Sequence, residues 1–530
     1  MLHAMRSRLT TQRVVRAVAT LVGSVTALSA CASGSTHTAA AAGAGSTNLR
    51  VAFLADMGPP DPDTFYATEG LMVTNSVYEG LLQYANNSTT IEGSLADLPT
   101  VSPNGLTYTF KLHAGVKFHD GTPFTSAAVA FSFARRKAVN QGPAYMLAHV
   151  KSVDTSDPLT AVIHLDQPVS AFRDYLASPF GPKMVSPTAI RAHSVGTDQA
   201  QAWLHTHDVG TGPYQITSFL PEQKYVLSAF SGYPGKAPAF KEVDISIQPS
   251  ISTQQLELEK GQLDMIMHGL QPGNVDTISH ESGLAVHRFP TELKTMLFVN
   301  SLRGAFTTTT ARDALEQALS KATLTRPFGT AGTVSTQVYP AGELPASATT
   351  STATYDPSVL RKLVPTLPTK KVDIGYDSTD PRNQQVADLM QATLHGLGLD
   401  ATDRAIPIAQ IFNLASQPSL APTILVQTTN PDASHPDTWA RIYMGKGGGA
   451  NYLQCVDPEV DKLLDAGLSA TAPAAADAAY GKAGDRIAQG GCFIDIADVK
   501  DTIVTRTGLT GFYHVPSLPW SFKLAALANG

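Results

Sequence analysis

Histidines and acidic residues are the side chains of this sequence best suited to chemistry, but their spacing forms no catalytic arrangement. The chain has no GxSxG nucleophile turn, no HExxH zinc helix, no P-loop and no GxGxxG dinucleotide fingerprint. Its 15 histidines are scattered, and the one close pair is His205-x-His207, a spacing that could place two imidazoles on one face of a strand. Because no third ligand lies nearby, we favour an interpretation without a metal site, a cofactor or catalysis.

The segment at 428–439, TTNPDASHPDTW, is the best candidate for ligand contact. It follows a predicted strand at 423–426, and α/β folds place their ligands at the carboxyl ends of strands. Within it, Asp432 offers a carboxylate, which a cleft closing over a charged amine needs in order to offset the cost of desolvation. Aspartate is also favoured as a cap of turns, so a structural role for Asp432 after Pro431 is the alternative.

Periodic patterns predict the elements that position this segment. Residues 372–376 and 423–426 have the composition of strands, and 381–395 has that of a helix which Gly396 stops. A strand, a helix and a second strand in this order predict a parallel α/β layer. The candidate ligand segment begins where the second of these strands ends.

The stretch at 102–136 carries the clearest pattern in the chain. Large apolar and polar residues alternate over 106–112, which predicts a half-buried strand, and a short apolar run at 116–118 predicts a second one. After a turn, Thr125 is placed to cap a helix over 126–136. The stretch therefore predicts two strands, a turn and a capped helix, and we interpret all of them as scaffold.

Three parts of that stretch, GLTYTFKL, GVKFHDGTPFT and VAFSFAR, closely resemble the signature of bacterial extracellular solute-binding proteins of the peptide and nickel type, the receptors of oligopeptide ABC importers. Looser resemblance extends from about residue 49 to the end of the chain. Family members usually have an acid at the position of Ala128, so this helix lacks half of a capping box. The resemblance implies an α/β, two-lobed periplasmic-binding-protein-like fold with an extra domain, in which mixed sheets flanked by helices surround a hinged cleft.

The same resemblance implies how the chain is divided among domains. Sequences similar to the family's YEGL, GTGPY and LFVN elements mark successive parts of the fold. The predicted segments are a lipoprotein signal peptide at 1–30, a flexible tether at 31–48, a first domain at 49–82, 209–294 and 505–530, a second domain at 83–208, and a third domain at 295–504.

The resemblance also assigns a role to Asp432. In peptide-binding relatives, an aspartate four residues before the proline of a D-x-x-[DE]-P element pairs with the α-ammonium group of the peptide. Counting back from Pro436 gives Asp432, and this chain departs from the pattern in having His435 where relatives commonly have an acid. The resemblance therefore predicts that Asp432 anchors the ligand.

Further ligand contacts follow from the same comparison. Main-chain groups around Thr428, Thr429 and Asn430 would bond an extended peptide by strand addition, and Trp439 would line a side-chain pocket. Glu79, in the YEGL element, can face the cleft in relatives, and the alternative is a solvated carboxylate at a helix end.

The first thirty residues have the pattern of an export signal. Four arginines precede or begin an apolar run at 17–27 that is too short to span a bilayer. The tetrapeptide LSAC at 28–31 resembles a bacterial lipobox, which predicts lipid on Cys31 and stable anchoring through its acyl chains. An ordinary signal-peptide cysteine is the alternative. Residues 32–47 are almost wholly Ala, Gly, Ser and Thr, so we expect a flexible tether.

Charge and cysteine content limit the partners further. With 38 basic and 44 acidic residues the formal net charge is −6, and loss of the four arginines before Cys31 would leave 34 basic against 44 acidic residues, a charge of −10. An acidic chain has no electrostatic footprint for nucleic acid. In an oxidising exterior, the remaining cysteines Cys455 and Cys492 are predicted to form a disulfide worth about 2 to 4 kcal/mol.

Together with the resemblance, these features predict a monomeric lipoprotein receptor, on the outer face of the cytoplasmic membrane or in a periplasm, that closes over short peptides. It would deliver them to an ABC permease and its ATPase subunits. Within the family, the alternative ligands are an oligosaccharide, a nickel chelate or an opine, and a content of three tryptophans disfavours sugar. Outside it, the alternatives are a secreted lipoprotein hydrolase and a receptor-like protein used in signalling or adhesion.

Overall fold

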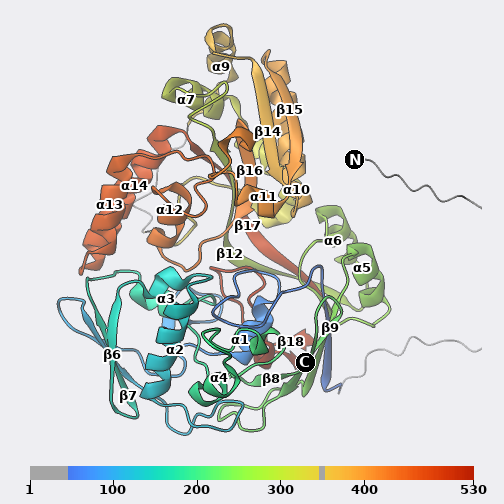
Figure 1. Ribbon diagram of the computed structural model, residues 1–530. Helices are drawn as coiled ribbons and strands as arrows, with labels where there is room; N and C mark the ends of the chain where they lie inside the picture. The colour runs from blue at the N-terminus through green and yellow to red at the C-terminus, as the bar shows by residue number, and fades with distance from the viewer. Residues whose placement is uncertain (1–45, 345–352) are drawn as a thin grey trace, which may run out of the picture. The chain divides into compact units, whose positions relative to one another are not determined.

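The structure is a computed structural model that describes residues 46–344 and 353–530 (Figure 1). The predicted signal peptide, the lipid-anchor residue Cys31 and nearly all of the predicted tether lie outside the described residues. Within the described ranges, no helix combines the length and the apolar character that crossing a bilayer requires.

Eleven strands form one large mixed sheet. Its centre is an antiparallel pair of long strands, β12 (Leu284–Val299) and β17 (Phe493–Arg506). Along the sheet the order is β15, β14, β16, β12, β17, β11, β1, β10, β9 and β8, with β13 paired to β17. The bounds of these other strands are β1 (Asn48–Phe53), β8 (Tyr214–Leu220), β9 (Lys224–Ala229), β10 (Glu242–Ile247), β11 (Met265–Ile266), β13 (Gly332–Val334), β14 (Lys371–Asp377), β15 (Asp400–Ile406) and β16 (Ile424–Thr429).

The predicted domain boundaries at 294/295 and 504/505 fall inside β12 and β17. Strand β12 pairs with β16 and strand β17 pairs with β11, so the segments expected as first and third domains share one sheet (Figure 1). The β12–β17 ladder shifts register between Phe289 and Leu293, and again near Thr295. Such bulges bend and twist a strand pair locally. They lie where the two halves of the sheet are connected.

The parallel layer expected between 372 and 426 is present. Strand β14 pairs parallel with both β15 and β16, and the helix α10 (Pro381–Gly396) connects β14 to β15. The sequence of β15, DATDRAI, lacks the apolar pattern that predicts a strand. Its residues are mostly polar because β15 lies at the edge of the sheet. Strand β16 continues to Thr429, three residues further than its pattern predicts.

A separate four-stranded sheet lies within 83–208, the segment expected as the second domain. Strand β5 (Thr107–Lys111) confirms the alternating pattern, but the run at 116–118 is not a strand. There the chain turns back on itself, and Lys117 forms only an isolated bridge with Pro123. The order of this sheet is β4 (Thr100–Val101), β5, β7 (Thr160–Leu165) and β6 (Val150–Asp157).

Helix α2 (Ser126–Val139) begins where the sequence predicts, but Thr125 does not cap it. Thr125 occupies the N-cap position in an extended conformation and makes no side-chain cap hydrogen bond. The turn between β6 and β7 holds the helix start instead: Ser126 N–H donates to Pro158 O (2.9 Å), and the Ser126 hydroxyl donates to Asp157 O (2.8 Å). The helix also continues three residues beyond the predicted end.

Two arginines of α2 are fully buried and tie this helix to distant segments. The Arg135 guanidinium donates to both oxygens of Asp61 (2.8 and 2.7 Å) and to Asp63 (2.6 Å). The Arg136 guanidinium donates to the carbonyl oxygens of Phe180 (2.7 Å) and Gly181 (3.1 Å). Together they fix the segment that follows β1 and the segment that follows α3 (Phe172–Ala177) against α2.

The remaining elements complete the fold around these two sheets (Figure 1). The other α-helices are α1 (Leu71–Val77), α4 (Pro187–His193), α5 (Ile251–Glu259), α6 (Pro272–Ile278), α7 (Thr309–Ala318), α8 (Lys321–Leu324), α9 (Pro357–Leu363), α11 (Ile408–Ile411), α12 (Pro436–Met444), α13 (Pro458–Leu468) and α14 (Pro473–Gly490). The short strands are β2 (Leu82–Tyr84), β3 (Ile91–Gly93), β18 (Leu509–Thr510) and β19 (Ala528–Asn529), and the 3₁₀ turns include η1 (Ala144–Leu147) and η2 (Trp203–His205).

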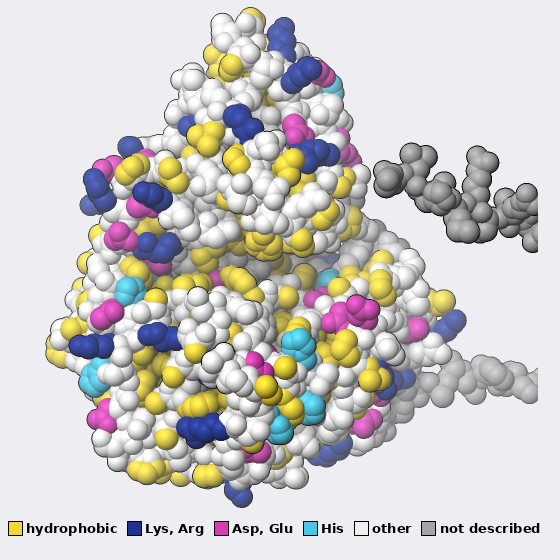
Figure 2. Space-filling view, in the orientation of Figure 1, with side chains coloured by type: hydrophobic (Ala, Val, Ile, Leu, Met, Phe, Trp, Pro, Cys, Tyr) yellow, Lys and Arg dark blue, Asp and Glu magenta, His cyan; other side chains and the backbone are white. Residues whose placement is uncertain are grey.

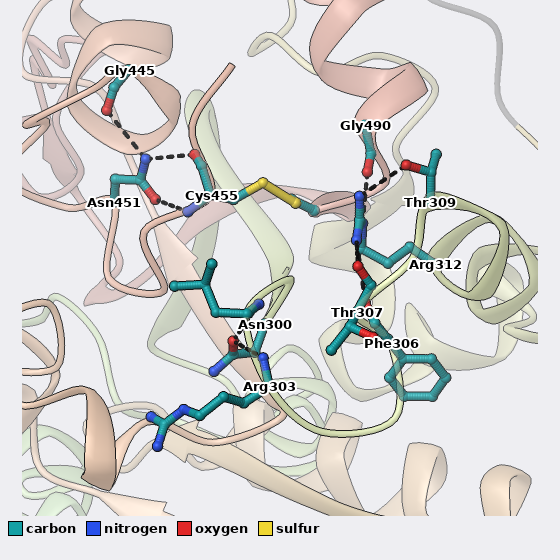
Figure 3. The surroundings of a disulfide bond; sticks show 12 residues. Asn300, Arg303, Phe306, Thr307, Thr309, Arg312, Gly445, Asn451, Cys455 and Gly490 are labelled. Carbon is teal, nitrogen blue, oxygen red and sulfur yellow. Dashed lines mark hydrogen bonds between the residues drawn. A yellow bond between two sulfur atoms is a disulfide. The ribbon is translucent and has the colours of Figure 1, made fainter. Parts of the chain in front are cut away.

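Cys455 and Cys492 form a disulfide, with their Cα atoms 6.4 Å apart. The bond joins the segment before α13 to the residue before β17 and closes a loop that contains α13 and α14 (Figure 3). Next to it, the Asn451 side chain donates to Cys455 O (2.8 Å) and to Gly445 O (3.1 Å), and it accepts from Cys455 N–H (3.2 Å). The covalent link ties this segment to the start of β17, and the amide fixes the local turn around Cys455.

We expect the double variant Cys455→Ala, Cys492→Ala to lose about 2 to 4 kcal/mol of unfolding free energy, because the unfolded chain gains the freedom that the bond removes. Urea unfolding of the oxidised protein and of the variant measures this difference. Reductant should destabilise the parent protein and leave the variant unchanged. Equal midpoints for the oxidised parent and the variant would contradict the expectation.

Candidate functional site

Asp432 lies in the loop between β16 and α12 and is buried, with 6% of its surface exposed. Its carboxylate accepts hydrogen bonds from the hydroxyl of Tyr66 (2.8 and 2.7 Å to the two oxygens) and from the hydroxyl of Tyr145 (2.8 Å). Tyr66 follows β1 and Tyr145 belongs to η1, so the tyrosines are 366 and 287 residues away in the chain. Three distant segments therefore meet at one carboxylate.

The charge of this carboxylate is only partly compensated. Burial raises the pKa of Asp432 to about 6, against the opposing effects of the two tyrosine hydroxyls and of the nearby Arg136 guanidinium. Among the described residues Asp432 has no ion-pair partner, because Arg136 directs its terminal nitrogens to the carbonyls of Phe180 and Gly181. The site thus holds a buried acid that neutral hydrogen-bond donors support.

The turn that follows Asp432 is capped by a different residue. His435 is the N-cap of α12, and its Nδ1 accepts a hydrogen bond from Asp437 N–H (3.2 Å). Burial lowers the pKa of His435 to about 4, so its ring is neutral at neutral pH and can act as an acceptor. The Asp432 carboxylate bonds to Tyr66 and Tyr145 and does not cap this turn. His435 makes the capping hydrogen bond instead.

The three residues before Pro431 lie at the end of β16. The hydroxyl of Thr428 bonds to Thr295 (2.8 Å) and Asn383 (2.8 Å), that of Thr429 bonds to Tyr443, and Asn430 O accepts from Tyr443 (2.9 Å). Strand β16 pairs with β12 through Thr429, but its ladder with β14 stops at Val426. One edge of β16 beyond Val426 therefore has no strand partner among the described residues.

Trp439 is a core residue in this structure. Its exposed fraction is 0%, its indole N–H donates to Val338 O (2.9 Å), and its ring lies 4.8 Å from that of Tyr443. The structure therefore does not bring Trp439 to a wall that a ligand side chain could reach. It packs α12 against the large sheet and so supports the segment that carries Asp432.

Glu79 lines a small pocket of about 30 Å³. Its carboxylate accepts from Thr211 (3.0 Å) and Tyr233 (3.2 Å), and burial raises its pKa. Two lysines also line the pocket: burial lowers the pKa of Lys183 to about 7 and that of Lys523 to about 8. Glu79 is therefore a carboxylate that lies in a pocket with two lysines. This differs from the alternative of a solvated carboxylate at a helix end.

The GTGPY element holds Glu79 in place through close backbone contact with α1. A Cβ atom on Gly210 would lie 1.9 Å from Val77 O, and one on Gly212 would lie 2.4 Å from Ser76 O. Only glycine permits this approach. The hydroxyl of Thr211, between the two glycines, then reaches Glu79.

The Glu79 pocket is connected to the Asp432 segment. Lys183 donates to Ser178 O (3.4 Å), and the Ser178 hydroxyl donates in turn to the main-chain oxygen of Asp432. Figure 2 shows that the face in view is crossed by a hollow with hydrophobic side chains along it, and that charged side chains of both signs are interspersed elsewhere. The connected residues therefore include carboxylates, Asp432 and Glu79, and ammonium groups, Lys183 and Lys523.

The two histidines of the close pair do not share one face of a strand. His205 ends η2 and does not lie on a strand, and His207 stacks on Trp203 with ring centroids 4.5 Å apart. On the other side, His193 stacks on Trp203 at 4.1 Å. Over the described parts of the chain, no group of three or more His, Cys, Asp or Glu residues is placed to hold a metal ion.

Solved structures with similar folds define the class of protein. The periplasmic binding protein DppA from Helicobacter pylori, in complex with the peptide STSA, has a TM-score of 0.77 and 20% identity, and the match covers 91% of this chain and 98% of that one. NikZ from Campylobacter jejuni, in complex with Ni(L-His), has a TM-score of 0.79 and 17% identity, covering 91% and 99%. The fold is the two-lobed periplasmic-binding-protein fold.

Sequence comparison then gives the family. Residues 90–451 match the family described as bacterial extracellular solute-binding proteins, family 5 Middle, and the chain belongs to this family. The probable D,D-dipeptide-binding periplasmic protein DdpA of Escherichia coli is 25% identical over 500 residues, 90% of this chain and 93% of that protein. The glutathione-binding protein GsiB of Pectobacterium atrosepticum is 28% identical over 491 residues, covering 88% and 92%. Members of the family are extracytoplasmic solute-binding proteins, which confirms the predicted resemblance.

Proposed function

We propose that this protein binds short peptides between its lobes and delivers them to an ABC permease, with Asp432 pairing with the α-ammonium group. The observation that carries the proposal is the Asp432 carboxylate, which is buried, has no ion pair among the described residues, and is reached by hydroxyls from two distant segments. An ammonium group supplies the missing charge and up to three hydrogen-bond donors. It can replace the tyrosine hydroxyls at an acid that burial otherwise disfavours.

Two neighbouring features support a peptide rather than a simple amine. Beyond Val426, β16 has an edge without a strand partner in the described chain, and an extended peptide can pair with such an edge. Lys183 and Lys523, in the connected pocket, offer positive charge to the carboxylate end of a zwitterion. Dipeptides and glutathione appear in the names of the proteins similar in sequence, which favours peptides over the nickel-chelate, opine and oligosaccharide alternatives.

The setting of this function is part of the proposal. A lipid group on Cys31 would hold the monomeric receptor at the outer face of the cytoplasmic membrane, and the segment at 32–47 would let it move between ligand and permease. Binding and release, without covalent change of the ligand, are its whole task. Radiolabelled palmitate incorporation that Cys31→Ala abolishes is the result expected for the anchor.

The function is tested by calorimetric titration with the tripeptide Ala-Ala-Ala and its N-acetylated form. We expect binding of the free amine and a loss of about 100-fold on acetylation, since a buried carboxylate then faces a neutral amide. Ni(L-His)₂, an opine and cellobiose are titrated in parallel. If one of these compounds binds and the peptides do not, the ligand belongs to that class and not to peptides. Cleavage of the peptide during incubation would favour the alternative of a secreted hydrolase.

The affinity for Ala-Ala-Ala should depend on pH through Asp432. The raised pKa of about 6 means that protons compete with the ammonium group below that pH. We therefore expect a plateau around pH 7, a loss of about tenfold per unit below pH 6, and a decline that begins near pH 8, where the peptide α-ammonium group deprotonates. Titrations between pH 4.5 and pH 8, at a temperature where the protein stays folded, measure the profile. An affinity that rises toward low pH would contradict it.

A further inference from the structure

A second group of acids lies next to the Asp432 segment. Asp174 belongs to α3, Glu292 to β12, and Glu343 to the loop that follows β13, so the three acids come from separate parts of the fold. Glu343 interacts electrostatically with both of the others, and Glu292 interacts with Asp174. The three carboxylates are therefore close enough to repel one another; Glu292 is buried, and Asp174 and Glu343 are half-buried.

The oxygens of these acids have few hydrogen-bond partners. Glu292 is 2% exposed; its Oε2 accepts from the Ser434 hydroxyl (3.0 Å), and its Oε1 is buried without a partner. Both carboxylate oxygens of Glu343 are buried and have no partner in the described structure. Asp174 accepts from the Tyr84 hydroxyl (3.0 Å). Glu292 and Glu343 therefore retain unused acceptor oxygens that are shielded from water.

Neighbouring cations do not neutralise the group. The Lys294 ammonium, which faces Glu343, donates to Asp498 (2.7 Å), Gln337 O (2.9 Å) and Ser335, and these three contacts use its three hydrogens. Arg173 precedes Asp174 on α3 but is exposed to solvent. Among the described residues, no Lys, Arg or His forms an ion pair with any of the three acids.

Burial without a counter-ion is costly, so these acids hold protons in the absence of a cation. Burial raises the pKa of Asp174 to about 7, and burial with repulsion by Asp174 raises the pKa of Glu292 to about 8. The pKa of Glu343 is raised for the same two reasons, with Glu292 as the nearest repelling charge. A cation placed among them would replace the protons and relieve the repulsion.

The acids are connected to the proposed ammonium anchor by short links. Ser434, two residues after Asp432, donates through its hydroxyl to Glu292 and through its N–H (3.0 Å) to the Tyr84 hydroxyl, which in turn donates to Asp174. The three acids and the proposed anchor therefore share the segment that carries Asp432 and Ser434. Within the described residues no three such side chains are spaced for a metal ion, which favours an organic cation.

We propose that Asp174, Glu292 and Glu343 form a subsite for a second cationic group of the ligand. The ligands are then short peptides with a lysine or arginine side chain, whose α-ammonium group pairs with Asp432 while the side-chain ammonium or guanidinium lies among the three acids. This inference rests on the proposed peptide-binding function and specifies its substrate class.

The test compares Ala-Lys-Ala with Ala-norleucine-Ala by calorimetric titration at pH 7.5, since norleucine keeps the aliphatic chain and removes the charge. We expect the lysine peptide to bind at least about 30-fold more tightly. In Glu292→Gln the two peptides should bind alike, with the affinity for the norleucine peptide retained, which also shows that the variant is folded. Glu459→Gln, on the exposed face of α13, is the matched control and should keep the preference.

The lysine preference should also grow as the pH rises from about 6 to 8, because the acids lose protons over that range. Titrations in buffers with different ionisation enthalpies should then show proton release that is larger for the lysine peptide than for the norleucine peptide. Equal affinities for the two peptides, or a preference that Glu292→Gln leaves intact, would overturn this subsite while peptide binding stands. Absence of binding by every peptide would refute the function itself.

Discussion

Asp432→Asn is expected to lower the affinity for Ala-Ala-Ala by about 100-fold, close to the loss caused by acetylating the peptide. Asparagine has the shape of aspartate and can still accept hydrogen bonds from Tyr66 and Tyr145, so packing at the loop between β16 and α12 is kept. What it lacks is the negative charge that an ammonium group needs in a site with little water. Removing that charge leaves the ligand cation desolvated and unpaired.

A double-mutant cycle makes this expectation specific. The parent protein and Asp432→Asn are each titrated with the free and the N-acetylated tripeptide. Acetylation should matter greatly to the parent and little to the variant, because both changes remove the same ion pair. Glu459→Gln, which alters an exposed acid of α13, should resemble the parent. If the binding free energies lost through acetylation and through Asp432→Asn simply add, Asp432 does not pair with the amine.

Arg135→Met is expected to reduce the free energy of unfolding by about 3 to 5 kcal/mol, the largest effect on stability that we predict. Arg135 is 1% exposed and donates to two buried acids, Asp61 and Asp63, and to Gln199 O (3.0 Å). Methionine fills much of the volume but leaves Asp61 without its counter-ion and Asp63 with only the Arg136 guanidinium, 3.7 Å away. Even with Arg135 present, burial raises the pKa of Asp63 to about 6.

Urea unfolding followed by far-UV circular dichroism measures this loss. Arg361→Met, on the exposed side of α9, is the matched control and should change the free energy by less than about 0.5 kcal/mol. Adding Asp61→Asn and Asp63→Asn to Arg135→Met should restore part of the stability, because the uncompensated charges are then gone. A loss below about 1 kcal/mol for Arg135→Met alone would show that water or protons compensate the acids at little cost.

Local pattern was sufficient for most elements and for the family. The alternation around Tyr108 and Phe110 predicted β5, and the residues from Pro381 to Gly396 predicted α10 and its end. Such signals depend on neighbours in sequence, which share a face of a strand or helix. Where tertiary contacts replace local ones, the pattern is misleading, as at Thr125, where the β6–β7 turn holds the helix start in place of a side-chain cap.

The candidate site was predictable only at its centre. Asp432 could be found because it follows a strand and lies in a recognisable element, but nothing near Tyr66 or Tyr145 in the sequence indicates that they meet it. The acids Glu292 and Glu343 also have no shared motif, since their proximity exists only after the chain has folded. Tyrosine and glutamate are common residues in any sequence, and only their burial in the folded protein makes these ones unusual.

Strands β12 and β17 have a mechanical consequence for the receptor. A pair of hydrogen-bonded strands flexes across its flat face and twists, but it resists stretching and lateral sliding because both would break the ladder. The register shifts near Phe289 and Thr295 are its compliant points. The angle between the parts at its two ends can therefore change while their spacing stays nearly constant, which restricts the motion to bending and torsion.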